Sequence, residues 1–168
     1  LHIPAGQIVA FSLHAPDVIH SFWMPQLGGK RDVVPGRVNR IVLTPDGPGE
    51  YPGQCAEYCG VSHANMRFRI IVHSKAELEQ WLADQQKPPA QPTDPLAQKG
   101  QELFSQSACV GCHTIAGVSG GVLGPNLTHF ASRKTMGANL MANTPENVAK
   151  WIENPGHMKP GVLMPDLG

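Results

Sequence analysis

The chain has 168 residues, enough for two small domains, and its formal net charge at pH 7 is zero. Charged residues make up only 15%, whereas the 18 glycines and 16 prolines favour turn-rich folds over long helices. The neutral total gives no reason to expect a nucleic-acid partner, and the apolar runs are too short for a signal peptide or a membrane span.

The first part of the chain alternates strand-like segments with turn signals. Residues 8–13 and 67–72 are short, apolar and rich in strand-forming residues, and residues 37–43 begin with the alternation of a half-buried strand. Residues 46–49 form a turn, and residues 17–25 are expected to be a loop that ends at Pro25. Many short strands with Gly/Pro turns indicate a β-sandwich or barrel of Greek-key type.

A cluster of metal-binding residue types follows within one short stretch, with the spacing C-x-x-x-C-x-x-x-H-x-x-M. It contains Cys55, Cys59, His63 and Met66. Thiolate and thioether are soft ligands, and a Cys/His/Met set points to copper used in electron transfer. A mononuclear site needs one cysteine, so the second cysteine suggests two thiolates that bridge two copper ions.

Each copper of such a pair needs its own imidazole, and the best upstream candidate is His20 in the segment DVIHSFWMP. A disulfide between Cys55 and Cys59 is the alternative, as expected for an exported protein. The remaining histidines have no comparable context and are expected to be surface or packing residues: His2, His14, His73, His129 and His157.

The segments DVIHSFWMP and GQCAEYCGVSHANM resemble subunit II of the heme-copper cytochrome c oxidases, over roughly residues 1–85. The resemblance implies an all-β, cupredoxin-like Greek-key sandwich with the binuclear copper centre CuA. It also implies that two transmembrane helices precede this domain, so we interpret the chain as a trimmed soluble fragment. The implied copper ligands are His20, Cys55, Cys59, His63, Met66 and the backbone carbonyl of Glu57, whose side chain would reach a magnesium ion shared with subunit I.

Helix signals and a proline-rich stretch mark the middle of the chain. Ser74 and Glu77 form a capping box, which predicts a helix to about Gln86. Prolines make residues 87–95 a semi-rigid linker. We therefore expect a copper domain at 1–86, this linker, and a second domain at 96–168, where Asp94 caps a helix with Pro95 at its first position.

The second domain carries the sequence C-x-x-C-H at Cys109, Cys112 and His113. This is the attachment signature of c-type heme, in which both thiols bind the porphyrin and the histidine binds the iron. A zinc site or a redox pair would not require the histidine that immediately follows. Thr144 and Pro145 predict a further helix that ends before Pro155.

The second iron ligand is less sharply specified, because several methionines follow the heme motif. Small class I cytochromes c, an all-α family that this part resembles, end in a Met-Pro loop, which selects Met164 over the runner-up Met158. Ligation by His129 or His157 instead would lower the potential. The resemblance also implies that the Pro125 carbonyl accepts a hydrogen bond from His113. The chain stops at Gly168, where cytochromes c add a helix, so the domain is expected to be C-terminally truncated.

Together the two parts resemble the caa-type oxidase, in which a cytochrome c is fused to subunit II. The resemblance implies cytochrome c oxidase activity in a complex with subunits I and III, on the outer face of the bacterial cytoplasmic membrane. An electron would come from a quinol-cytochrome c reductase or a soluble cytochrome c and pass from heme c through CuA to the heme of subunit I, for oxygen reduction and proton pumping.

Two other functions are compatible with the same motifs. The copper loop also suits a nitric oxide or nitrous oxide reductase, and a non-enzymatic copper carrier would use similar ligands. Quinol oxidases lack the copper ligands, so the presence of Cys55 and Cys59 argues against them.

Overall fold

A computed structural model describes residues 1–167, and by internal contacts the chain divides into two compact units. One unit comprises Leu1–Leu82 together with the segment from Thr135 onward, and the other comprises Ala83–Lys134. The predicted boundary at the linker 87–95 stays a prediction. Within the described residues, no helix combines the length and the apolar character needed to cross a membrane.

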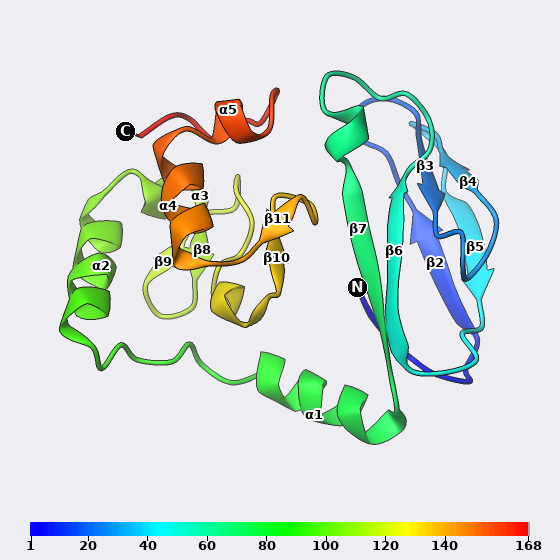
Figure 1. Ribbon diagram of the computed structural model, residues 1–168, viewed down its shortest axis with the longest axis horizontal. Helices are drawn as coiled ribbons and strands as arrows, with labels where there is room; N and C mark the ends of the chain where they lie inside the picture. The colour runs from blue at the N-terminus through cyan, green and yellow to red at the C-terminus, as the bar shows by residue number, and fades with distance from the viewer. Residues whose placement is uncertain (168) are drawn as a thin grey trace. The chain divides into compact units, whose positions relative to one another are not determined.

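The first part of the chain is built from strands, as the sequence predicts. They are β1 (His2–Pro4), β2 (Val9–Leu13), β3 (His20–Trp23), β4 (Arg31–Val33), β5 (Asn39–Leu43), β6 (Gly49–Cys55) and β7 (Arg67–His73). Five of them form a mixed sheet in the order β1-β7-β6-β3-β4, and β2 pairs with β5 in a second sheet. Figure 1 shows β6 and β7 as two long neighbouring strands, with β3 on the other side of β6.

Apolar side chains from both sheets make one core. Its buried members are Ile3, Met24, Leu43, Ile70 and Val72. Phe11, Phe22 and Phe68 pack against this core, and the rings of Phe22 and Phe68 are stacked with centroids 4.7 Å apart. Because these aromatic residues lie on strands that end near the metal-binding stretch, the core holds the strand ends in place.

Helices and short strand pairs follow in the order in which the chain continues. The helices are α1 (Lys75–Gln85), α2 (Pro95–Gln106), α3 (Cys109–Cys112), α4 (Pro145–Glu153) and α5 (Pro155–Met158), with 3-10 turns η1 (His63–Asn65) and η2 (Phe130–Ser132). Two antiparallel pairs, β8 (Thr114–Ile115) with β9 (Ser119–Gly120) and β10 (Thr135–Met136) with β11 (Met141–Ala142), add to the expected helices.

The predicted helix caps are confirmed by their hydrogen bonds. The Glu77 carboxylate accepts from the Ser74 amide at 2.8 Å, and Asp94 accepts from the amides of Leu96 and Ala97 at 2.9 and 3.1 Å. Thr144 Oγ1 accepts from the Asn147 amide at 3.3 Å at the start of α4. Each cap satisfies backbone donors that a helix leaves without partners at its first turn.

The segment around His20 differs from the expected loop. His20 begins β3, which pairs with β4 and β6 in the five-stranded sheet. Ser21 in this strand is only 2% exposed. The segment starts with polar residues, so its local sequence does not indicate a strand. It becomes a strand because β4 and β6 supply its hydrogen bonds, and these pairing partners cannot be read from the local sequence.

Candidate metal and heme sites

Strand pairing brings the two parts of the predicted copper site together. Phe22 in β3 lies opposite Cys55 at the end of β6, and the Ala56 amide donates to the Ser21 carbonyl at 2.9 Å. His20 therefore lies beside Cys55, although 35 residues separate them. The Cys55 amide also donates to the Met66 carbonyl at 2.9 Å, which closes the stretch between β6 and β7 into a loop.

The donor atoms form a chain with the two thiols at its centre. Cys55 Sγ and Cys59 Sγ lie 3.7 Å apart. His20 Nδ1 lies 3.7 Å from Cys55 Sγ, and His63 Nδ1 lies 3.5 Å from Cys59 Sγ. Each thiol therefore has its own imidazole. Nitrogen and sulfur atoms at these separations are close enough to ligate the same metal ion.

Two further atoms complete this arrangement. Met66 Sδ lies 3.7 Å from Cys59 Sγ, and the Glu57 carbonyl oxygen lies 3.2 Å from Cys55 Sγ. Both cysteines are free thiols in the structure. All six predicted copper ligands are thus brought together, and the soft donor set of two sulfurs, two imidazoles and a thioether fits copper.

The two imidazoles have different neighbours. Asp17 accepts a hydrogen bond from His20 Nε2 at 2.9 Å, which leaves Nδ1 facing the thiol. His63 instead packs edge-on against the Tyr58 ring, with centroids 5.7 Å apart. Sequence reasoning missed both neighbours. The signal for Asp17 was its position three residues before His20, but no pattern marks Tyr58.

The electrostatics of the site favour thiolate at Cys55. Burial raises the pKa of Cys55, but backbone hydrogen bonds at Ser21 and Glu57 and the His20 side chain outweigh burial and lower it to about 7. The pKa of Cys59 is raised by burial and by the neighbouring Cys55 thiolate. One thiol of the pair therefore ionises readily without metal, as a soft-metal site requires.

The charged group behind His20 also shifts the ionisation of that ring. Burial alone would lower the pKa of His20, but its hydrogen bonds to Asp17 and Cys55 raise it above the ordinary value. The pKa of Asp17 is lowered, chiefly by its hydrogen bond to His20. A carboxylate that holds the outer nitrogen of a metal-binding histidine fixes the ring orientation and makes it a stronger donor.

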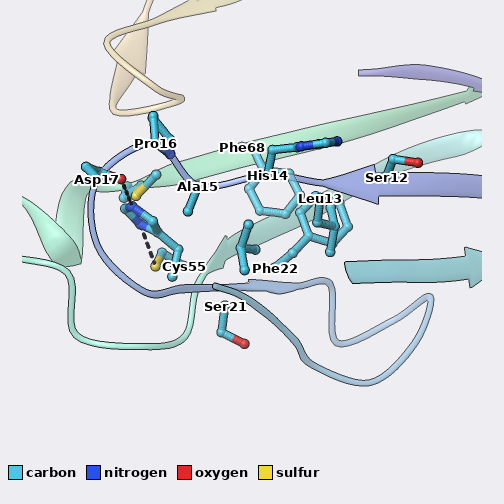
Figure 2. Close-up of a pocket in the computed structure, with 13 residues that line it drawn as sticks. Ser12, Leu13, His14, Ala15, Pro16, Asp17, Ser21, Phe22, Cys55 and Phe68 are labelled. Atoms are coloured by element: carbon cyan, nitrogen blue, oxygen red, sulfur yellow. Dashed lines mark hydrogen bonds and ion pairs between the residues drawn. The ribbon is translucent and has the colours of Figure 1, made fainter. Parts of the chain in front are cut away.

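A pocket of about 470 Å³ adjoins the copper site. Its walls are mostly apolar, with Leu13, Phe22 and Phe68 among them, and they also include Asp17 and His20. Figure 2 shows Asp17 and Cys55 together at one end of the pocket and Ser12 at the other.

The heme motif lies on a short helix. Cys109 and Cys112 are the first and last residues of α3, and both are free thiols. Residues three apart on a helix face the same side, so both sulfurs can reach one porphyrin. His113 Nδ1 lies 2.8 Å from the Pro125 carbonyl, as predicted, which leaves Nε2 for an iron ion.

Two glycines allow the chain to approach His113 closely. A Cβ atom at Gly124 would lie 2.5 Å from Cε1 of the His113 ring, and one at Gly121 would lie 2.5 Å from the Cys112 carbonyl carbon. Neither position has room for a side chain. The backbone around the heme motif is therefore shaped to hold the histidine ring in one orientation.

The helical part has almost no core of its own. Between Pro95 and Leu167, only Met136 and Pro155 are buried. Several large apolar side chains there are exposed: Leu96 79%, Leu103 58%, Val122 87%, Leu123 85% and Leu163 98%. Four of them, Leu96, Leu103, Val122 and Leu123, belong to the compact unit that carries His113, and exposed apolar side chains of this kind suit contact with another apolar group such as a porphyrin.

The candidates for the second iron ligand lie near the end of the described chain. Met158 is the last residue of α5, and Met164 follows in the loop after it; both are half-buried. They belong to the compact unit that does not contain His113. The assignment of Met164 stays a prediction. Of the two histidine alternatives, His129 is engaged by its Nε2, which lies 3.0 Å from the Gln85 carbonyl.

Comparison with known families assigns both halves of the chain. Residues 1–75 match the model of the cytochrome c oxidase subunit II periplasmic domain, and residues 97–167 match the model of cytochrome c. The first half therefore carries a copper-site domain from the outer side of the membrane, and the second carries a heme-binding domain. The cupredoxin-like strands of the first half and the helices of the cytochrome c half confirm the predicted fold class.

Curated relatives match nearly the whole chain. Cytochrome c oxidase subunit 2 of Alkalihalophilus pseudofirmus is 42% identical over 98% of this chain and 48% of its own length. The subunit 2 of Bacillus subtilis is 35% identical over 98% of this chain and 49% of its own length. The chain thus spans about half the length of these relatives.

Among solved structures, the periplasmic domain of subunit II of cytochrome oxidase from Bradyrhizobium japonicum is 33% identical, with a TM-score of 0.49, over 50% of this chain and 61% of that one. The two family matches and the curated relatives agree on one assignment. The chain belongs to the cytochrome c oxidase subunit II family, in the form that joins the copper-binding periplasmic domain to a cytochrome c domain.

Proposed function

We propose that the chain is the electron-transfer portion of subunit II of a heme-copper cytochrome c oxidase. Electrons enter at a covalent heme c, pass to a binuclear CuA centre and leave to the heme of subunit I, where oxygen is reduced and protons are pumped. The partners are subunits I and III and an upstream reductase or cytochrome c. The natural location is the outer face of the bacterial cytoplasmic membrane.

This proposal rests on the arrangement of two free thiols side by side, each with a histidine nitrogen next to it. Cys55 Sγ and Cys59 Sγ are 3.7 Å apart, and each lies beside a different imidazole nitrogen. A mononuclear site needs one cysteine and would leave the other without a role. Two thiolates, each paired with its own histidine, suit two metal ions that share both sulfurs.

The residues of the chain prepare this centre before metal binds. The strands β3 and β6 hold His20 and Cys55, and the loop between β6 and β7 returns Cys59, His63 and Met66 to them. When bound, a copper pair shares one electron between two metals. The fixed positions of the ligands limit the change of geometry that accompanies each electron, which keeps transfer fast.

The peptide at Glu57 has two roles in the proposal. Its carbonyl lies 3.2 Å from Cys55 Sγ and would ligate copper. Its carboxylate is exposed and would bind a magnesium ion at the interface with subunit I. At the heme end, Cys109 and Cys112 attach the porphyrin, His113 binds the iron and Met164 supplies the second ligand, which gives a higher potential than two histidines would.

Oxygen consumption by the complete membrane complex tests the proposal. In a Cys59→Ser complex, heme c should still be reduced by the donor, whereas oxygen uptake should fall to background because electrons cannot leave the heme. Wild-type oxygen uptake in this variant would contradict the proposed path.

The same preparation separates the two other functions. A nitric oxide or nitrous oxide reductase would consume those gases instead of oxygen. A copper carrier would release its copper quickly to a chelator and would reduce no gas.

A further inference from the structure

Three aromatic rings from three different elements meet at one edge of the five-stranded sheet. His2 lies in the edge strand β1, His73 ends the neighbouring strand β7, and Trp81 lies in α1. The rings of His2 and Trp81 are nearly parallel, with centroids 3.9 Å apart and an interplanar angle of 10°. Nδ1 of His2 lies 2.7 Å from Nε2 of His73, and the centroids of these two rings are 5.0 Å apart. We refer to His2, His73 and Trp81 as the ring stack.

The helix α1 lies against the sheet without burying any of its residues completely. Among its apolar side chains, Leu82 is 47% exposed, whereas Trp81 is half-buried with its ring on His2. A surface helix is held in place mainly by the apolar side chains that it packs against its neighbours. The contact of Trp81 with His2 is therefore an important part of what holds α1 on the sheet.

The two imidazoles of the ring stack share a single hydrogen. At 2.7 Å, one of the facing nitrogens of His2 and His73 donates and the other accepts. The pair can take up one extra proton and keep this hydrogen bond. When both rings are protonated, however, two N–H groups face each other and neither has an acceptor. Full protonation therefore separates the rings.

The surroundings of the ring stack also oppose a second proton. Burial, the Leu1 ammonium group and His73 lower the pKa of His2 from 6.5 to about 4. The charged group of α1 that acts on the pair is Glu77, whose pKa is lowered chiefly by its hydrogen bonds to Ser74 and also by His73. This carboxylate acts on His73, so His2 is the ring that resists charge.

We infer that the ring stack is an acid-sensitive fastener for α1. While at least one imidazole is neutral, the hydrogen bond between the histidines keeps His2 in place for Trp81 to stack on. When both imidazoles are charged, the rings separate and α1 leaves the sheet. Because α1 is the last helix before the proline-rich residues 87–95, its release lengthens the segment that joins the copper half of the chain to the heme half. This device is separate from both cofactor sites and adds a response to acid to the electron-transfer role.

The direction of the acid response follows from the protons that each state binds. The pKa of His2 is low only while the ring stack is intact, so the released state binds more protons below pH 6.5. The contribution of the stack is complete above pH 6.5 and is lost as the pH falls toward 4. Within that range, each pH unit weakens the attachment of α1 by at most about tenfold.

Amide hydrogen exchange in α1 tests the fastener in the full chain, loaded with heme and copper. Exchange is measured at pH 7.5 and 5.5 and corrected for the intrinsic effect of pH on amide exchange. Between these values, the opening equilibrium of α1 should rise about tenfold. The amides of β5, which pairs with β2 in the other sheet, provide an internal reference and should keep their protection.

Two substitutions separate the roles of the rings. His2→Phe keeps a flat ring on which Trp81 can stack but cannot take up a proton, so α1 should be equally protected at both pH values. Trp81→Leu removes the stacked ring and should leave α1 poorly protected at both. His14→Ala changes an exposed histidine outside the ring stack and should respond to acid as the wild type does. Acetylation of the Leu1 amino group should also preserve the response, because burial is the main cause of the low pKa of His2.

NMR titration of the His2 ring measures its pKa without any substitution, and we expect a value below 6.5. A value above 6.5 would show that the attraction of a charged imidazole to the face of Trp81 outweighs burial, and it would overturn the inference. Equal protection of α1 at pH 7.5 and 5.5 in the wild type would do the same, as would a wild-type response in His2→Phe. Loss of copper in acid would affect the wild type and His2→Phe alike, so it cannot produce the expected difference between them.

Discussion

The Sγ atoms of Cys55 and Cys59 lie 3.7 Å apart, and neither thiol is in a disulfide. A disulfide would need the sulfurs at about 2.05 Å, so the loop holds the thiols close without joining them. The neighbouring His20 and His63 nitrogens extend this pair at both ends. The arrangement is that of two sulfurs prepared to share metal ions.

Replacing either thiol should therefore abolish the pair. In Cys55→Ser and Cys59→Ser, copper content should fall from two ions per chain to one or fewer, because a hydroxyl is a poor bridging ligand for copper. The EPR signal of an electron shared between two coppers should disappear. Ala64→Ser, an exposed change in the same loop, should keep both properties. A shared-electron signal that survives in Cys59→Ser would contradict the assignment.

Copper affinity should become more steeply dependent on pH below about 7. The pKa of Cys55 is lowered to about 7, so above that pH this thiol is already ionised and copper displaces no proton from it. As the pH falls through 7, copper must displace that proton, and each unit costs about tenfold in affinity from this group alone. Burial lowers the pKa of His20, but its hydrogen bonds to Asp17 and Cys55 raise it above the ordinary value, so protonation of this ring adds to the loss of affinity as the pH falls.

Chelator competition for the first Cu(I) between pH 8.5 and 5.5 measures this dependence. Cys59, whose pKa is raised, releases a proton across the whole range, so some slope is expected above pH 7 as well. The expected result is a line that steepens near 7. A single slope through that range would show that Cys55 is an ordinary thiol in the folded chain.

Substitution of Gly124 should disturb heme attachment. A Cβ there would meet the His113 ring at 2.5 Å, so Gly124→Ala must displace the histidine or the loop, at a cost of about 1–3 kcal/mol. The yield of covalent heme and the thermal stability of the heme form should both fall. Gly120→Ala is the matched control, because nothing lies within 4 Å of its Cβ position. Equal behaviour of the two variants would remove the role given to the close approach.

Two methionine substitutions distinguish the candidates for the second iron ligand. Met164→Leu should lose the methionine-to-iron absorption band of the oxidised heme and lower the potential, because thioether ligation raises it. Met158→Leu makes the same methionine-to-leucine change at the other candidate position and should retain the band. The reverse result would assign Met158 as the ligand instead.

Local sequence predicted some strands and missed others for reasons that the structure makes clear. β2, β5 and β7 were expected because they carry apolar or alternating residues. β6 was not, since it contains Pro52 and Gly53. Pro52 is tolerated because β3 pairs with β6 only at Gln54 and Cys55, and Gly53 is required because a Cβ there would meet the Phe68 ring at 2.4 Å.

The candidate site shows the same limit. The spacing of Cys55, Cys59, His63 and Met66 is local, so the motif identified these residues, and His20 was chosen as the upstream imidazole that a second copper would need. The contacts of Asp17 with His20 and of Tyr58 with His63 depend on how the loops fold back. No spacing rule predicts such contacts, because they follow from side-chain directions rather than from sequence distance.

The most direct test of the central claim is metal analysis combined with EPR spectroscopy on the full chain after copper loading and heme maturation. The account predicts two coppers and one covalent heme per chain, with one electron shared between two copper nuclei in the oxidised form. A single copper per chain with its electron on one nucleus, or Cys55 bonded to Cys59 in the loaded protein, would contradict it.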